Sequence, residues 1–314
     1  MDRTPHSLLP SIQLDIADWF SDHARQLPWR SADCSPWGVL VSEIMLQQTP
    51  VVRVLPRWQQ WLERWPTPAA LAAEPAGEAV RAWDRLGYPR RALRLHAAAS
   101  RITEEYDGEV PSTVAELKSL PGIGDYTAAA VAAFAFGVRA TVVDTNIRRV
   151  EARLFSGLAL PSPSLTAAEM TLADSVLPLE EAGSVRWNAS VMELGALVCT
   201  ARSPKCSDCP VRDRCAWIAA GEPEPTYQPK GQPWAGTDRQ LRGAVMAVLR
   251  AASTPTPWDV FFTPPVLLHE ASLSKPLKHL HALGSEPSRL ERILEDLVKD
   301  GLAERTENGL ALPA

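Results

Sequence analysis

The sequence predicts an all-α protein that ends in a small C-terminal module of mixed helix and strand. Apolar residues recur at helical spacing through most of the first 220 residues, as at Ile12, Ile16 and Trp19. No alternating strand pattern appears in that region. A proline-rich segment at 221–237 then precedes a final stretch that combines an amphipathic helix with a hairpin turn signal.

The composition is that of a globular protein with one large domain or two. The chain has 314 residues, of which 46% are apolar and 22% charged. No apolar run reaches the ~18 residues that a spanning helix requires, and the N-terminus lacks the basic start and apolar core of a signal peptide. We therefore expect a soluble, cytoplasmic protein.

The charge distribution is uneven. The net charge is -5 with a pI near 5.8, which argues mildly against a nucleic-acid partner. Residues 81–101 nevertheless hold six arginines and one acid, whereas acidic side chains gather in the C-terminal third. We expect one basic face on an otherwise acidic protein.

The first 220 residues are expected to form about ten short helices. Helical periodicity is clear at 12–23, 51–62 and 93–102. Breakers separate the helices; they are Pro36, Pro66, Pro68, Pro75, Gly87, Pro111 and the segment 121–124. This region, residues 1–220, is predicted to be one functional part of the chain.

The C-terminal third is predicted to form a separate module at 238–314, joined by the linker 221–237. Residues 239–251 have a helical pattern, and 288–299 form a clear amphipathic helix. Two short strands are expected within 302–312, around the Asn308-Gly309 turn. Helix followed by hairpin indicates a winged-helix-like module.

Four cysteines lie close together in the spacing C-x6-C-x2-C-x5-C. They are Cys199, Cys206, Cys209 and Cys215, whereas Cys34 is far away in a polar loop. Four thiolates this close suit either zinc or a [4Fe–4S] cluster. Zinc ribbons usually pair two C-x2-C knuckles and only one is present, so the spacing favours iron–sulfur.

A glycine turn and an acidic helix start suggest contacts with a phosphate and a sugar. The stretch LPGIG (120–124) precedes an apolar helix, so backbone N–H groups near Gly122 and Gly124 suit a phosphate. In VVDTNIRRV (142–150), Asp144 occupies a helix N-cap position. Taken alone, Asp144 is equally well explained as a structural cap.

Residues 42–50, SEIMLQQTP, place Glu43 among apolar neighbours. The ordinary interpretation is a helix whose glutamate points to water, because charged side chains are mostly exposed. The alternative is a buried carboxyl whose pKa is raised by desolvation. The stretch by itself favours the ordinary interpretation.

The combination of helix, PGIG turn, helix, VDTN and the four cysteines resembles the helix-hairpin-helix, iron–sulfur DNA glycosylase superfamily over residues ~10 to ~220. This resemblance implies a six-helix domain, an iron–sulfur helical domain and one [4Fe–4S] cluster per chain. Four stretches further resemble the adenine DNA glycosylases, the MutY family. These stretches are LPWR (27–30), SEIMLQQT (42–49), LGY (86–88) and WNASVMELGALVC (187–199).

The resemblance implies a monofunctional enzyme that hydrolyses the N-glycosidic bond of adenine. Endonuclease III-like relatives carry a catalytic lysine where this chain has Tyr126, so no Schiff base is expected. Glu43 would protonate the departing adenine, and Asp144 would stabilise the oxocarbenium-like sugar. Tyr126 and Asn146 would organise the Asp144 side. The adenine pocket would be formed by Trp29, Arg30 and Glu193.

The implied partner is double-stranded DNA with adenine opposite 8-oxoguanine or guanine, bound by a monomer at the bacterial nucleoid. The implied DNA contacts are Leu46, Gln47, Gln48, Thr49, Leu86, Gly87, Tyr88, Gly122 and Gly124. The aromatic-Ser-His loop by which many relatives read the oxidised guanine is absent after residue 235. Two alternatives remain open: a thymine or other mismatch glycosylase, and a non-catalytic iron–sulfur DNA-binding protein.

Overall fold

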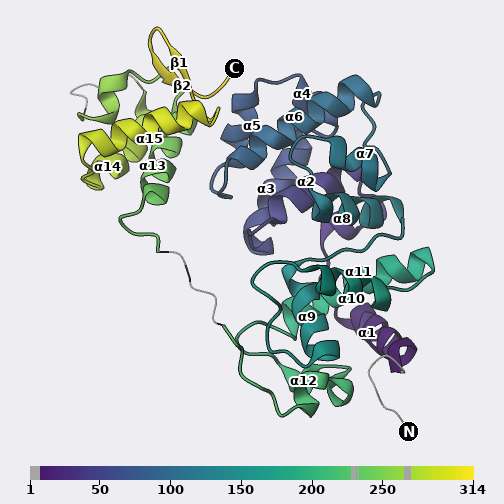
Figure 1. Cartoon of the computed structure of the whole chain (residues 1–314). Helices are drawn as coiled ribbons and strands as arrows, with labels where there is room; N and C mark the ends of the chain where they lie inside the picture. The colour runs from purple at the N-terminus through teal and green to yellow at the C-terminus, as the bar shows by residue number, and fades with distance from the viewer. Residues whose placement is uncertain (1–7, 228–230, 232, 265–269) are drawn as a thin grey trace. The chain divides into compact units, whose positions relative to one another are not determined.

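The computed structural model describes residues 8–227, 231, 233–264 and 270–314, and its regular structure is almost entirely helical (Figure 1). Contacts divide the chain into two compact units. The first comprises Met1–Glu43, Pro111–Ser119 and Ile123–Lys230, and the second comprises Ile44–Val110, Leu120–Gly122 and Gly231–Ala314. Each unit has its own core, so the two are described separately.

The first unit is built around two helices, α9 (Thr145–Ser156) and α11 (Glu181–Leu197). They pack on one another, α10 and α12 add to α9, and α1 packs on α11. The alanine-rich α8 is buried along much of its length, because small side chains let neighbours approach closely. The other helices of this unit are α1 (Leu9–His23), η2 (Pro28–Arg30), α7 (Val114–Ser119), α8 (Asp125–Phe136), α10 (Ala167–Val176), η3 (Cys206–Asp208), η4 (Arg212–Arg214) and α12 (Ala216–Ala219), while α2 (Pro36–Leu46) begins here and ends in the second unit.

The second unit has a core rich in tryptophan. The ring of Trp61 meets those of Trp65 and Trp83 edge-on, with centroids 4.7 and 5.8 Å apart, the arrangement that aromatic quadrupoles favour. Helix α6 (Arg90–Glu105) packs against α4 and α5 beside this cluster. The remaining helices here are α3 (Val51–Arg64), α4 (Pro68–Ala72) and α5 (Ala76–Trp83).

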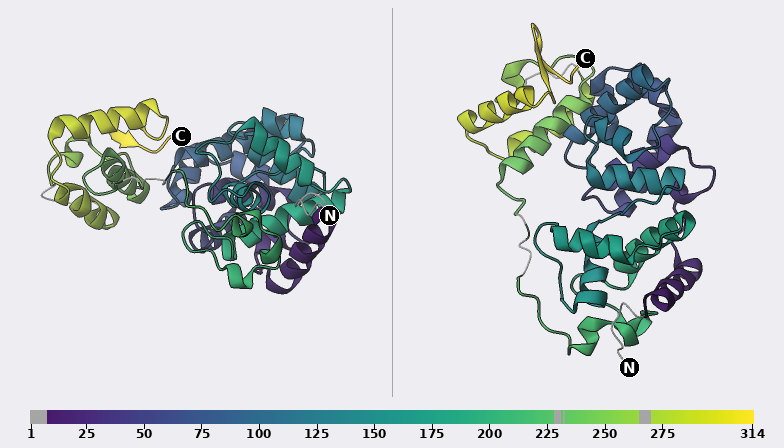
Figure 2. Two further views of the ribbon diagram at one scale, coloured as in Figure 1. Left: turned by 60° about the horizontal axis from the view of Figure 1, so that its bottom comes forward. Right: turned by 45° about the vertical axis from the view of Figure 1, so that its right-hand side comes forward.

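The C-terminal residues of the second unit form three α-helices, two short 3-10 helices and a β-hairpin (Figure 2). Strands β1 (Glu304–Thr306) and β2 (Gly309–Ala311) pair antiparallel, and Thr256 adds a bridge to Leu310 on the other side of β2. The order of helix followed by hairpin is the one that the sequence predicted, and the winged-helix likeness stays a prediction. The helices are α13 (Asp238–Ala251), η5 (Trp258–Phe261), η6 (Ala271–Leu273), α14 (Ser274–Ala282) and α15 (Pro287–Lys299).

Specific backbone contacts fasten this C-terminal module to α5. The amide of Gly77 donates to the carbonyl of Pro313 at 2.8 Å, and a Cβ at Gly77 would collide with that carbonyl. Arg250 Nε donates to the carbonyl of Val80 at 3.0 Å, and Arg81 donates to the carbonyl of Ala252 at 2.9 Å. Burial lowers the pKa of Arg250 to about 10. These hydrogen bonds satisfy polar groups that packing removes from water, so they help to hold the module against α5.

The predicted fold class is confirmed. The helices predicted at 239–251 and 288–299 and the hairpin at 302–312 are present. Within the described residues no strand precedes residue 220, and twelve α-helices stand there rather than about ten. None of the described helices is long and apolar enough to cross a membrane. The predicted boundaries 1–220, 221–237 and 238–314 stay a prediction, and part of the linker lies outside the described residues.

The six arginines of 81–101 do not all lie on one basic face, although Arg85, Arg90 and Arg94 are exposed. Arg91 is buried, and Arg101 pairs with Glu105 on its own helix. Arg81 pairs with Glu78 and also donates to backbone carbonyls of the C-terminal module. The sequence gives no sign of these partners, because the partners of Arg81 and Arg91 lie far away along the chain.

Candidate active site and cluster loop

Glu43 lies near the end of α2 with only 5% of its surface exposed. The hydroxyl of Tyr126, in the first turn of α8, donates to Glu43 Oε2 at 2.8 Å. Burial and, to a smaller extent, the charge of Asp144 raise the pKa of Glu43 to about 7, although the Tyr126 hydrogen bond and Arg30 oppose the rise. The buried alternative for Glu43 is therefore the one that the structure adopts, and its carboxyl is half protonated near neutral pH.

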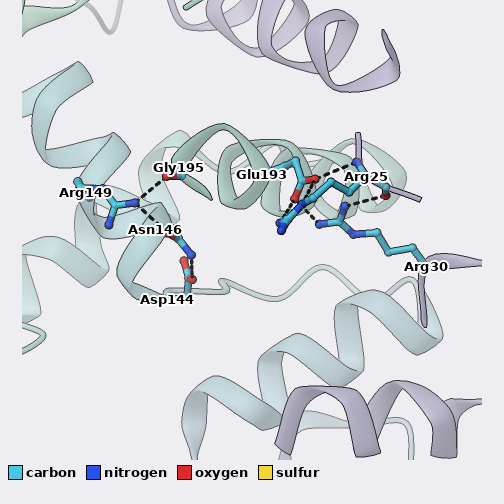
Figure 3. Close-up of polar contacts among 7 residues, drawn as sticks. All are labelled: Arg25, Arg30, Asp144, Asn146, Arg149, Glu193 and Gly195. Carbon is cyan, nitrogen blue, oxygen red and sulfur yellow. Dashed lines mark hydrogen bonds and ion pairs between the residues drawn. The ribbon is translucent and has the colours of Figure 1, made fainter. Parts of the chain in front are cut away.

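Asp144 is the N-cap of α9, as its sequence position indicated. One carboxylate oxygen accepts from the amide of Ile147 at 2.7 Å, and the other accepts from Asn146 Nδ2 at 2.7 Å (Figure 3). Burial raises the pKa of Asp144, whereas these hydrogen bonds and the charge of Arg149 act to lower it. Two hydrogen-bond donors thus stabilise the ionised form of Asp144, whereas one stabilises that of Glu43.

Tyr126 was expected to organise the Asp144 side of the site, but its hydroxyl donates to Glu43 instead. Burial raises the pKa of Tyr126 well above its usual value, and the charges of Glu43 and Asp144 add to this. The phenol therefore stays a donor. Asn146, in contrast, contacts Asp144 as expected.

A buried arginine holds Asn146 in place. Arg149 Nη2 donates to Asn146 Oδ1 at 2.8 Å and to the carbonyl of Gly195 at 2.7 Å (Figure 3). Its Nε donates to the carbonyl of Cys199 at 2.7 Å. A Cβ on Gly195 would lie 2.7 Å from that of Asn146, so only glycine lets α11 approach this closely. Hydrogen bonds thus run from Asp144 through Asn146 and Arg149 to the backbone of the first cluster-loop cysteine.

Glu193, on α11, is completely buried and ion-paired with two arginines. Arg25 donates to it through its backbone amide and through a two-pronged guanidinium contact at 2.7 Å, and Arg30 Nη2 donates at 2.9 Å (Figure 3). Burial alone would raise the pKa of Glu193, but these hydrogen bonds lower it to about 2. Trp29, beside Arg30 in η2, is also buried. Glu193 and Arg30 therefore form one charged cluster in the first unit.

In the second unit, Arg91 joins the two segments predicted to contact DNA. Its Nη1 donates to the carbonyls of Ile44 and Gln47, and its Nη2 donates to Thr49 Oγ1 and the carbonyl of Gly87, both at 3.1 Å. Burial lowers the pKa of Arg91 to about 10. A single guanidinium therefore fastens the end of α2 to the turn before α6.

The side chains of these two segments face different ways. Gln48 and Tyr88 are exposed and both have left-handed φ, at 54° and 47°. Leu86 and Thr49 are buried, and Thr49 Oγ1 donates to the carbonyl of Leu86 at 3.1 Å. Left-handed backbone at a non-glycine residue costs free energy and is often retained at functional sites. Gln48 and Tyr88 are thus presented to solvent, whereas Leu86 packs inside.

The glycine turn has the features expected of a phosphate-binding hairpin. Gly122 has φ 79°, a conformation that favours glycine, and Gly124 caps the N-terminus of α8. A Cβ at Gly122 would collide with the side chain of Arg94. In the first unit, α7 packs on α8.

The four clustered cysteines line one pocket, together with Arg153 and Trp217. Arg153 Nη1 donates to Cys199 Sγ at 3.3 Å, and its guanidinium lies over the ring of Trp217 at 4.9 Å. Among the described residues, no three Cys, His, Asp or Glu side chains converge closely enough to hold one metal ion. Four thiolates are the usual ligands of a [4Fe–4S] cluster, so the cysteines that line this pocket have the chemistry that such a cluster needs.

Sequence analysis missed the structural arginines Arg25, Arg91, Arg149 and Arg153. Each donates to backbone carbonyls or a buried acid. Arg149 and Arg153 stand one helical turn apart on the buried face of α9. Charged residues at apolar helix positions were the available signal, because buried arginine needs many acceptors.

We predict that Arg91→Met destabilises the second unit and frees both DNA-contact segments. Several buried carbonyls would lose a charged donor, at a cost of about 2–4 kcal/mol in the free energy of unfolding. Urea unfolding measures the loss of unfolding free energy. Faster amide hydrogen exchange at 46–49 and 86–88 would show that the two segments have become mobile. Arg90→Met is the matched control, because Arg90 is an exposed neighbour whose ion pair with Asp300 contributes little. Equal losses for the two variants would contradict this role of Arg91.

We also predict that Glu193 gives the protein an acid-sensitive stability. Because its folded pKa lies below the unfolded value, its contribution is present above about pH 4.5 and is lost as pH falls towards about 2. The full loss is about 3 kcal/mol. Glu193→Gln should flatten this part of the pH dependence of unfolding, whereas Glu181→Gln, exposed on the same helix, should keep the wild-type slope. An unflattened slope for Glu193→Gln would contradict the ion pairing.

Two family descriptions match the chain. Residues 41–173 match the HhH-GPD superfamily of base excision DNA repair proteins, and residues 199–215 match the iron–sulfur binding domain of endonuclease III. The second match spans all four clustered cysteines. The expected [4Fe–4S] cluster loop is thus confirmed.

Solved structures share the helical fold. A thermostable thymine-DNA glycosylase is 27% identical, with a TM-score of 0.61 over 68% of this chain and 98% of that chain. The structure of an endonuclease III–DNA covalent intermediate is 24% identical, with a TM-score of 0.59. The match covers 69% of this chain and 98% of that chain. The second likeness supports the fold alone.

Curated relatives decide between the alternatives. The adenine DNA glycosylase of Mycolicibacterium smegmatis is 44% identical over 94% of both chains, and that of Mycobacterium tuberculosis is 43% identical over 95% of this chain and 92% of the relative. The human adenine DNA glycosylase matches at 39% identity, over 64% of this chain and 38% of its own. These relatives support neither a thymine-specific enzyme nor a non-catalytic binder, and the chain belongs to the adenine DNA glycosylase family.

Proposed function

We propose that this protein hydrolyses the N-glycosidic bond of adenine mispaired with 8-oxoguanine or guanine in double-stranded DNA, and acts as a monomer. The observation that carries this proposal is the pair of buried carboxyl groups with unequal hydrogen bonding, Glu43 and Asp144. Breaking a purine glycosidic bond needs an acid for the base and a negative charge for the sugar. The sequence families named above supply the substrate class.

Glu43 is proposed as the general acid. Its pKa of about 7 leaves a substantial protonated fraction at neutral pH, as proton donation to a ring nitrogen of adenine requires. Protonation turns a poor leaving anion into a neutral base. A well-placed proton donor accelerates such a step by about 10²–10⁴-fold. Tyr126 then stabilises the carboxylate that remains, because its hydroxyl donates to Glu43 Oε2.

Asp144 is proposed to stabilise the positive charge that develops on the deoxyribose. Donors from Ile147 and Asn146 hold its two oxygens and favour its ionised form. Arg149 fixes Asn146, so the carboxylate has little freedom to rotate. Water completes the hydrolysis, and no amine is present at Tyr126 to form a Schiff base, so the DNA strand stays uncut.

The remaining predicted site residues are proposed to bind the substrate. Trp29, Arg30 and Glu193 would form the adenine pocket, with Arg30 held by Glu193. Gln48 and Tyr88, both exposed and left-handed, would contact the bases around the flipped adenine. Gly122 and Gly124 would bind a backbone phosphate. Leu86 and Thr49 are buried and would act indirectly by shaping the two segments. Leu46, Gln47 and Gly87 are half-buried and would contact the DNA beside Gln48 and Tyr88.

The [4Fe–4S] cluster is proposed to be held by Cys199, Cys206, Cys209 and Cys215, which line one pocket. Four thiolates are its usual ligands. When bound, the cluster supplies a rigid covalent tie across the loop. Arg153 then donates to the Cys199 sulfur, and Arg149 to the Cys199 carbonyl.

We predict that adenine release falls about tenfold per pH unit above about pH 7, because Glu43 must be protonated. Tyr126→Phe should move this basic limb to higher pH, since the lost hydrogen bond favours the carboxylate. Single-turnover release from an adenine·8-oxoguanine duplex, with alkali to reveal abasic sites, measures both. Glu43→Gln should abolish release while DNA binding persists. Wild-type activity in Glu43→Gln would reject the proposed acid.

We predict that purified protein contains about four iron atoms per chain. Cys206→Ser should lower the iron content and the visible absorbance, whereas Cys34→Ser should change neither, because Cys34 lies outside the cluster pocket. Iron analysis and thermal unfolding make the comparison without any activity assay. Stoichiometric zinc, or equal iron loss in Cys34→Ser, would contradict the ligand set.

A further inference from the structure

The chain that leads into Asp144 is extended and belongs to no helix or strand. Helix α8 ends just before Gly137, whose left-handed φ of 73° turns the backbone, and Asp144 then caps α9. Ala140 and Val143 between them are buried. In the part of the chain that the structure describes, no backbone group of 139–143 bonds to another backbone group. Buried peptide groups of this kind need side-chain partners.

Asn188 is the side-chain partner of Ala140. It lies on α11 with only 2% of its surface exposed, and its Nδ2 donates to the carbonyl of Ala140 at 2.9 Å. Next to Ala140, the Thr141 hydroxyl donates to Asp174 at 2.8 Å, but this bond lies on the exposed surface. The bond between Asn188 and Ala140 is therefore a buried anchor that joins the extended segment to α11.

Helix α11 contacts the chain on both sides of Asp144. Gly195 follows Asn188 by two helical turns on the same face of α11, about 10 Å along the helix axis. A Cβ at Gly195 would lie 2.7 Å from that of Asn146, so the helix backbone touches Asn146 there (Figure 3). Asn188 therefore holds the chain just before Asp144, and Gly195 meets it just after.

The hydrogen bonds within the cap do not replace this anchor. Ile147 and Asn146 hold the Asp144 carboxylate relative to α9, and Arg149 holds Asn146. None of these bonds fixes the chain that enters the cap from α8. Glu193, which is expected in the adenine pocket, is carried by α11 as well (Figure 3). One helix therefore carries a residue of the expected base pocket and both contacts around Asp144.

We propose that Asn188 is a positioning residue for the Asp144 carboxylate and acts through the carbonyl of Ala140. This proposal rests on the proposed function, in which Asp144 stabilises the charge on the deoxyribose. Because Asn188 and Glu193 share α11, the anchor fixes the anion relative to the adenine pocket. A displacement of about 1 Å at a reacting group can lower a rate about 100-fold. Loss of the anchor therefore slows bond cleavage and leaves the DNA-contact segments unchanged.

Asn188→Leu removes the donor and keeps a similar side-chain volume. In the full-length protein with its cluster, single-turnover adenine release from an adenine·8-oxoguanine duplex should fall about 10- to 100-fold. The affinity for the same duplex carrying 2′-fluoro-2′-deoxyadenosine should stay unchanged; this nucleoside resists cleavage because fluorine destabilises an oxocarbenium-like sugar. Amide hydrogen exchange at 138–144 should become faster, because the segment has lost its buried anchor.

Asn188→Asp supplies a readout that a purely structural role would not move. An ionised carboxylate cannot donate to the Ala140 carbonyl, whereas a protonated carboxyl can donate through its O–H. Burial favours the protonated form, so the ratio of the variant rate to the wild-type rate at the same pH should rise as pH falls from about 8 to about 5. Taking this ratio at each pH removes the dependence on Glu43. The variant also reports on the anchor if Asn188→Leu does not fold.

Ser190→Ala is the matched control. Ser190 is also buried on α11, but its hydroxyl donates to the carbonyl of Arg186 within the same helix, at 2.6 Å. This variant should lose stability and keep the wild-type rate. The role of Asn188 is overturned if Asn188→Leu releases adenine at the wild-type rate, if Ser190→Ala slows release equally, or if the Asn188→Asp ratio does not change with pH. A wild type that releases no adenine would instead reject the proposed function, and the role of Asn188 with it.

Discussion

Two carboxyl groups buried with unequal sets of donors are the constraint on which this structure depends. Burial raises the pKa of both Glu43 and Asp144. Glu43 receives one phenolic hydroxyl, whereas Asp144 receives a backbone amide and a side-chain amide. In the proposed mechanism this difference in donors lets one carboxyl group act as the acid and the other as the anion. The helical packing of the first unit keeps this difference fixed.

Buried arginines are the means by which short helices are held at the required positions. Arginine carries five donors and stays charged, so one side chain can satisfy several backbone carbonyls at once. Arg149 links Asn146, Gly195 and Cys199, and Arg153 links the cluster loop to α9. Arg91 does the same for two segments of the second unit. The short helices are therefore positioned by arginine hydrogen bonds in addition to the packing of the apolar core.

Local signals predicted much of the fold, whereas the candidate site was predicted from the family resemblance. Helical periodicity, the Asp144 cap, the glycine turn and the cysteine spacing each involve neighbours in sequence. Contacts between residues far apart in the sequence could not be predicted in this way. Tyr126 contacts Glu43 rather than Asp144, and Leu86 is buried. The docking of the C-terminal module through Gly77 and Arg250 depends on residues more than 150 positions apart, so no local pattern signals it.

The protonation state of Glu43 in the folded protein tests the central claim most directly. Carbon-13 NMR of protein labelled at the glutamate carboxyls, with Glu43→Gln to assign the resonance, follows this group without any reaction. The account predicts a titration midpoint of about 7 for Glu43. A midpoint near the ordinary value for glutamate, about 4.3, would show that the carboxyl is ionised at neutral pH and would contradict its role as the acid.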